Sequence, residues 1–156
     1  MNSYGLADPS FLEPGRMDAQ RIDRWADLLT DYCLAVQPGE TILIASELEA
    51  RPLVEACYRA VVRRGGLLLL RLDLPGLSEY FLEQAGPAQL EHCPPTALFE
   101  AEHCDGRIRI SAETDTRSMS RIDPRRQAVV DKARQPIREA ARKRRWVLTQ
   151  YPTTAY

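Results

Sequence analysis

Short apolar runs recur along the chain at intervals that suggest strands of a parallel sheet. "TILIAS" at 41–46 and "LLLLRLD" at 67–73 are apolar nearly throughout, and strand-like stretches return near 107–112 and 146–151. Strands buried on both faces show such continuous runs, whereas half-exposed strands alternate. The pattern predicts four strands, and it predicts that "LLLLRLD" is covered on both faces.

Between the strands, apolar residues recur every three or four positions, which is the spacing of amphipathic helices. From Asp18 the predicted apolar face consists of Ile22, Trp25, Leu28, Leu29, Tyr32, Cys33 and Val36. The next helix opens with acids and Pro52 and closes at Arg63, Arg64 and Gly65, which suit the first and last turns of a helix.

The second half of the chain is richer in prolines, which divide its helices. "LSEYFLEQAG" and "PPTALFEAEHC" predict two short helices. A longer helix follows, with Asp123 as its N-cap and Pro124 in its first position, and Pro136 should kink or restart it.

Strands that alternate with helices predict an α/β fold. We expect an open, mainly parallel four-stranded sheet with helices on both faces, which is a three-layer sandwich. Residues 1–17 have no periodicity and are expected to be a flexible leader, so the domain is assigned to 18–156.

Composition and charge narrow the functional classes. The 156 residues are 44% hydrophobic and carry a net charge of −1, which fits one ordinary domain and disfavours a general affinity for nucleic acid or membranes. The N-terminus lacks the apolar core of a signal peptide, so the protein is placed in the cytoplasm. The cysteines, Cys33, Cys57, Cys93 and Cys104, are accordingly expected to be buried, reduced thiols.

Two His-Cys pairs, His92 with Cys93 and His103 with Cys104, supply four potential ligands for a soft metal. Zinc sites usually space their near ligands by two to four residues, because adjacent side chains point in different directions on a helix. We therefore favour core cysteines with surface histidines, and a metal site is the alternative.

Basic residues gather between 121 and 145, where they include Arg125, Arg126, Arg138 and Arg142. Such a stripe could follow a phosphate backbone. Interspersed acids dilute it, and the favoured interpretation is a solvated helix face.

Acidic residues follow the predicted strands at the points where three of them end: Glu47, Asp73 and Glu113. The carboxyl ends of parallel strands share one edge of a sheet, where ligands bind. The acids are therefore candidates to line a cleft, although acids after strands also cap the helices that follow.

Three stretches carry a family resemblance: "VQPGETILIASELEARPLVEACYRAVVRRGG", "RIDPRRQAVVDKARQPIREA", and a tryptophan followed by "YPTTAY". From about Asp18 to Tyr156 the chain resembles the amino-terminal domain of the M29 metalloaminopeptidases, the aminopeptidase T and aminopeptidase S group. The resemblance implies an enzyme that removes N-terminal residues from peptides and works as a homodimer.

In that family a larger domain follows and holds a pair of zinc, cobalt or manganese ions. The resemblance implies that every metal ligand lies beyond Tyr156, so we assign no catalytic or metal-binding residue to this chain and expect its main partner to be the missing catalytic domain. Tyr151, in the "YPT" segment, joins Glu47, Asp73 and Glu113 as a candidate cleft-lining residue. The alternative is a free-standing α/β module that binds peptides or a protein without catalysis.

Overall fold

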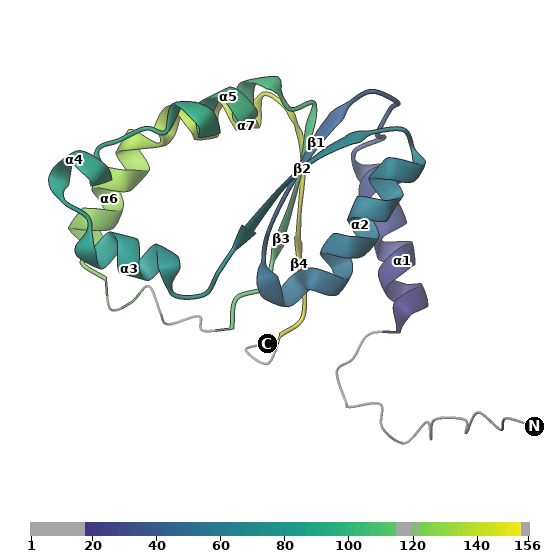
Figure 1. Cartoon of the computed structure of the whole chain (residues 1–156), viewed down its shortest axis with the longest axis horizontal. Coiled ribbons are helices and arrows are strands. Elements are labelled where there is room, and N and C mark those ends of the chain that lie inside the picture. The colour runs from purple at the N-terminus through teal and green to yellow at the C-terminus, as the bar shows by residue number, and fades with distance from the viewer. Residues whose placement is uncertain (1–17, 115–119, 121, 154–156) are drawn as a thin grey trace, which may run out of the picture.

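The computed structural model describes residues 18–114, 120 and 122–153, so the expected leader, 1–17, lies outside the described residues. Its four strands form one sheet in the order β2-β1-β3-β4, and every neighbouring pair is parallel (Figure 1). The strands are β1 (Thr41–Glu47), β2 (Leu67–Asp73), β3 (Gly106–Ser111) and β4 (Arg145–Gln150). The predicted α/β fold with an open parallel sheet is confirmed.

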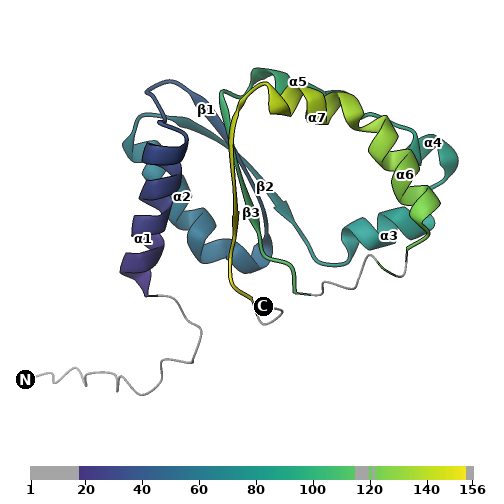
Figure 2. The same ribbon diagram turned by 180° about the vertical axis from the view of Figure 1, so that it is seen from behind.

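Helices cover both faces of this sheet, as expected for three layers. Helices α1 and α2 lie on one face and α5 and α7 on the other, while α3, α4 and α6 extend away from the sheet (Figures 1 and 2). The helices are α1 (Ala19–Asp27), the π-helix η2 (Leu28–Cys33), the 3₁₀ turn η3 (Leu48–Ala50), α2 (Arg51–Arg63), α3 (Leu77–Gln84), α4 (Pro87–Leu90), α5 (Pro95–His103), α6 (Pro124–Ala133) and α7 (Gln135–Arg142). None of the helices in the described part of the chain has the length and apolar character needed to cross a membrane.

The main core lies between the two central strands and the α1–α2 layer. Ile42 and Ile44 of β1 and Ile108 and Ile110 of β3 are fully buried there, because alternate residues of a strand point to the same face. The intervening residues of β1 are also buried. Strand β1 is therefore covered on both faces, which explains its unbroken apolar run.

The prediction that "LLLLRLD" is covered on both faces is wrong. Among the strands that the structure describes, β2 lies at the edge of the sheet beside β1, and Leu67, Leu70 and Leu72 are 60%, 41% and 40% exposed. The sequence pattern reports hydrophobicity but not strand order, so it could not separate this edge strand from a central one.

The apolar face predicted for the first helix is also partly wrong. After α1 the backbone widens into the π-helix η2, in which the amide of Leu34 donates to the carbonyl of Leu29, five residues back, at 3.1 Å. The wider turn brings Leu34 into the core and leaves Leu28, Tyr32 and Cys33 exposed. A helical wheel with 3.6 residues per turn misplaces these side chains.

A second, smaller core joins α3, α4 and α6. Its buried residues are Leu82, Ala85, Leu90, Ile122 and Val130. Arg126 donates to the carbonyl oxygens of Leu82 and Ala85, and the guanidinium of Arg134 lies 5.7 Å from the centre of the Phe81 ring.

The helix at Pro124 follows the prediction in two respects. The Asp123 carboxylate accepts from the Arg125 amide at 2.9 Å, and α7 restarts around Pro136 after α6 has ended. Its basic residues do not form a purely solvated face, however, because Arg126 and Arg134 are used to hold α3 against α6.

Candidate functional site

The order in which strands are added to the sheet reverses beside β1, between β1 and β3. From β1 the chain proceeds to β2 on one side and then returns to β3 on the other. In open parallel sheets ligands bind at the carboxyl ends of the strands beside such a switch point. Glu47, the last residue of β1, lies there, and its Oε2 accepts a hydrogen bond from the Ala112 amide at 2.6 Å. The Glu47 carboxylate therefore bridges the ends of the two central strands.

Arg109 of β3 joins Glu47 to Asp73. Its Nη2 pairs with Glu47, and its Nη1 lies 3.0 Å from Oδ2 of Asp73. Glu47 and Asp73 are aligned across β1 and β2, and Arg109 is aligned with Ala45. The sheet thus brings together two of the acids that the sequence singled out, but it brings them together around a cation.

The other two candidates lie apart from this ion-pair cluster. Glu113 is exposed, and its backbone carbonyl accepts from the Thr153 hydroxyl at 2.7 Å. The Tyr151 side chain is half-buried against the core that α1 and α2 cover, and its amide donates to the Ser111 carbonyl at 2.7 Å. That the four residues line a catalytic cleft stays a prediction.

The described residues do not fit a pair of metal ions, which needs several converging carboxylates and imidazoles. Arg109 holds Glu47 and Asp73, while His103 stacks on Phe99 with 3.8 Å between ring centroids and has its Nδ1 2.7 Å from the Phe99 carbonyl. Over residues 18–114, 120 and 122–153, no group of three histidine, cysteine or acidic side chains is placed to bind a metal.

The cysteines are free thiols in three different environments. Cys57 and Cys104 are buried, and burial raises the pKa of both thiols, that of Cys57 to about 12. Cys93 is half-buried. Cys33 is exposed, so the expectation of a buried thiol is wrong there, and the π-helix is the reason.

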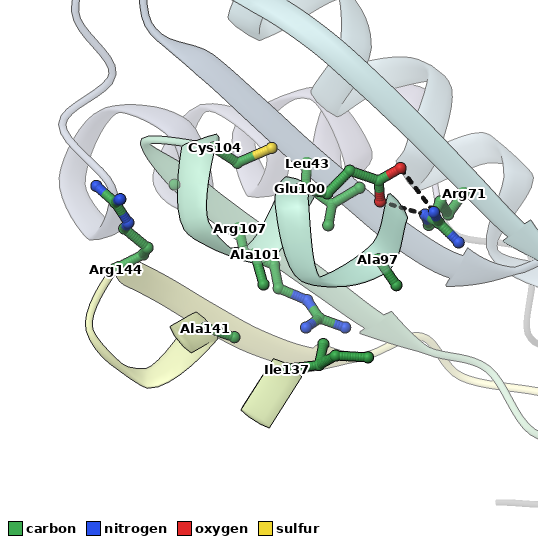
Figure 3. A pocket seen from close by; sticks show the side chains of 11 residues that line it. Leu43, Arg71, Ala97, Glu100, Ala101, Cys104, Arg107, Ile137, Ala141 and Arg144 are labelled. Carbon is green, nitrogen blue, oxygen red and sulfur yellow. Dashed lines mark hydrogen bonds and ion pairs between the residues drawn. The ribbon is translucent and has the colours of Figure 1, made fainter. Parts of the chain in front are cut away.

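A cavity of about 150 Å³ lies between the sheet and helices α5 and α7 (Figure 3). Leu43, Ala97, Ala101, Ile137 and Ala141 supply its apolar lining, and Arg71, Glu100, Arg107 and Arg144 supply its charged groups. Arg71 and Glu100 form a two-pronged ion pair, with both N to O distances at 2.6 Å. Sequence reasoning missed this cavity; the available signal was "GRIRIS", in which two arginines share one face of a predicted strand and isoleucines share the other.

Comparison with models of known protein families identifies the family of this chain. The model of the thermophilic metalloprotease family (M29) matches residues 18–156, so the chain belongs to the M29 metalloprotease family, as the resemblance indicated. Among solved structures, wild-type AmpT from Thermus thermophilus has a TM-score of 0.71 and 18% identity to this chain.

That match covers 88% of this chain and 37% of the AmpT chain. At this identity the likeness is evidence of a shared fold. The chain spans well under half the length of this solved relative. No curated protein matches the chain.

Proposed function

We propose that the chain is the amino-terminal, non-catalytic α/β domain of a metal-dependent aminopeptidase that removes N-terminal residues from peptides. The observation that carries the proposal is the ion-pair cluster at the switch point, where Arg109 engages both Glu47 and Asp73. Acids held in this way are poor metal ligands, because a metal would have to displace a cation that is already paired. Membership of the M29 family supports the hydrolase class.

In such an enzyme a separate catalytic domain, outside residues 18–156, holds the zinc, cobalt or manganese pair. That AmpT extends well beyond the matched region supports this division. The domain described here acts as a rigid wall beside the cleft. Glu113 and Tyr151 at the carboxyl end of the sheet, with the Glu47–Arg109–Asp73 cluster, face the peptide.

The exposed aromatic and aliphatic side chains of β4 are the proposed contact with the catalytic domain or with a second subunit of a cytoplasmic homodimer. Trp146 and Leu148 are 61% and 59% exposed and lie on the same face, two residues apart. Large exposed apolar side chains that lie together commonly mark protein interfaces. Light scattering of the chain across a concentration series tests the dimer, and a monomer at every concentration counts against it.

The test of the non-catalytic role uses the purified chain with Zn²⁺, Co²⁺ or Mn²⁺ and a chromogenic aminoacyl anilide. We expect no turnover above that of metal and buffer alone. Arg109→Met, which frees Glu47 and Asp73, should be equally inactive, because two carboxylates do not fix a metal pair. Turnover that survives repurification and disappears in Glu113→Ala contradicts the proposal and places the active site in this chain.

A free-standing module that binds extended peptides is the second candidate, and the open edge of β2 favours it. A peptide can add a strand to such an edge and place its side chains against the exposed leucines. The open reading frame distinguishes the two functions. Continuation past Tyr156 into a segment rich in histidine and glutamate supports the enzyme, and a stop codon supports the module.

A further inference from the structure

Three arginines lie on the face of the sheet below α5 and α7: Arg71 of β2 and Arg107 and Arg109 of β3. Two of them have carboxylate partners, since Arg71 pairs with Glu100 and Arg109 pairs with Glu47 and Asp73. Arg107 lies on the same face two residues before Arg109, aligned with Leu43, and within the described residues no carboxylate is paired with it.

Arg107 is half-buried, and one nitrogen of its guanidinium group is shielded from solvent. Its Nε is buried and has no hydrogen-bond acceptor among the residues described. Burial lowers the pKa of the guanidinium, and the positive charges of Arg109 and Arg71 lower it further, while the negative charge of Asp73 opposes the shift. Buried polar groups in folded proteins almost always have partners, so a bare guanidinium nitrogen here points to a missing acceptor.

The Arg107 side chain borders two separate hollows. Its side chain reaches from β3 into the cavity, between Ala101 of α5 and Ile137 of α7 (Figure 3). A second hollow of about 230 Å³ adjoins Arg107 on the β4 side. Besides Arg107 it is lined by Arg109, Arg138, Ala141, Arg142, Trp146, Val147 and Leu148. Arg107 is thus common to two hollows that have cationic and apolar walls.

The size and lining of the first cavity restrict the ligand. A water molecule needs about 10–15 Å³ of such space, so 150 Å³ holds on the order of ten waters or a small organic molecule. Alanine and isoleucine side chains make much of the wall, and the Arg107 guanidinium offers a planar fork that matches one carboxylate, while Arg144 at the rim already donates to the Glu102 carbonyl. A phosphate dianion would lose more hydration energy against this apolar wall than a carboxylate monoanion would.

We propose that Arg107 is the centre of a binding site for a small, free organic carboxylate that carries a short apolar group. The carboxylate pairs with the Arg107 guanidinium and supplies the missing acceptor. The apolar group lies against Ala101, Ile137 and Ala141. The site is independent of the peptidase role, since neither a metal nor a peptide enters it, and either proposal can fail without the other.

Isovalerate is a suitable probe, titrated into the 156-residue chain by calorimetry and followed by amide chemical shifts. We expect saturable binding at one site, with a Kd on the order of 1 mM, as is typical for a ligand of so few atoms. The largest shifts should fall on Ala97, Ala101 and Ile137. The neutral alcohol 3-methylbutan-1-ol and inorganic phosphate should each bind at least about tenfold more weakly.

Arg107→Met should weaken isovalerate binding at least about tenfold. The matched control is Arg125→Met, which removes an exposed arginine of α6 that lines neither hollow, and it should leave the Kd within about twofold. Arg107→Lys keeps the charge without the fork and should give an intermediate affinity. The thermal midpoint should rise with isovalerate in the unmodified chain and in Arg125→Met, but not in Arg107→Met.

Three results would overturn the proposal: no saturable binding of isovalerate by the unmodified chain, equal binding by Arg107→Met, or shifts that cluster away from α5 and α7. The first is also the result expected if a carboxylate of another polypeptide segment fills the site. Phosphate binding as tight as that of isovalerate would overturn the assignment to a carboxylate. If Arg107→Met does not fold, the chemical shifts and the neutral alcohol decide the outcome on the unmodified chain.

Discussion

The indole ring of Trp25 stacks on the phenol ring of Tyr151, with ring centroids 6.3 Å apart and planes inclined by 13°. Trp25 belongs to α1, and Tyr151 directly follows β4, so the contact joins the first described helix to the segment after the last strand. Both rings pack against the main core. Tyr151 therefore has a structural role whatever it contributes to a cleft.

Tyr151→Ala should lower the free energy of unfolding by about 2 kcal/mol, because it removes a half-buried ring and an aromatic pair. Urea unfolding followed by far-ultraviolet circular dichroism measures the change. Tyr32→Ala is the matched control: Tyr32 is 84% exposed, and the substitution should change stability by less than about 0.5 kcal/mol. Equal effects of the two substitutions would contradict the role assigned to the Trp25–Tyr151 contact.

Glu40 should make the stability of the chain depend on acid pH. Its hydrogen bond with Arg145 is the main cause that lowers the pKa of Glu40. Arg145 also donates to the Leu34 carbonyl at 2.6 Å, so the pair ties the start of β4 to the segment before β1. A pKa lowered by folding means stability that is present above the unfolded-state pKa, near 4.5, and is lost as pH falls through the folded-state value.

The unmodified chain should therefore lose more stability between about pH 5 and pH 3 than Glu40→Gln does. At pH 7 the variant should be less stable by under about 1 kcal/mol, because solvent screens a pair that is partly exposed. Urea midpoints measured from pH 3 to pH 7 give the loss of stability with falling pH and the stability difference between the two proteins at pH 7. Glu91→Gln, an exposed substitution outside the pair, should follow the unmodified chain, and identical pH profiles for all three proteins would refute the prediction.

Cys33 and Cys57 should differ strongly in their reaction with iodoacetamide at pH 8. Cys33 is exposed, while burial raises the pKa of Cys57 to about 12 and closes access to it. Because the thiolate is the nucleophile, Cys57 should be alkylated only when the chain unfolds. Peptide mass spectrometry after timed quenching measures both rates, with the urea-unfolded chain as the reference in which they converge. Equal rates in the folded chain would contradict the packing of α2.

The same substitution at two arginines of β3 should have opposite effects. Arg109→Met leaves Glu47 and Asp73 without their cation and should destabilise the chain by about 1–2 kcal/mol, because Glu47 is largely buried while solvent screens the more exposed Asp73. Arg107→Met removes a half-buried cation whose Nε has no acceptor among the described residues, and it should leave stability unchanged or raise it by about 1 kcal/mol. Chemical unfolding of both variants makes the comparison. A larger loss at Arg107 than at Arg109 would show that Arg107 has a partner within the chain.

Local patterns in the sequence were sufficient to locate the strands and most of the helices. "TILIAS" and "GRIRIS" are short and bounded by turn residues, and Pro124 and Pro136 mark helix starts directly. What the patterns omit is placement across the sheet. Whether "LLLLRLD" is central or at the edge depends on strand order, which long-range pairing decides and no local window contains.

The candidate site shows the same division between local and long-range information. The positions of Glu47 and Asp73 at strand ends were predictable, because strand ends are local. Their neutralisation by Arg109 was not, since Arg109 lies 62 residues beyond Glu47 and meets it only through the register of β1 with β3. The π-helix is a third case, in which one wide turn changes which side chains reach the core.

The open edge of β2 has a consequence for handling the protein. Among the residues that the structure describes, no strand pairs with the outer side of β2, and the leucines at 67, 70 and 72 are exposed on this strand. An apolar edge of this kind is a template on which further strands can assemble, and Lys or Pro on an edge strand is the usual natural protection. The isolated domain is therefore expected to aggregate through β2, and a lysine in place of Leu67, which is 60% exposed and lies on the face opposite to that of Ile42 and Ile44, would oppose edge-to-edge association.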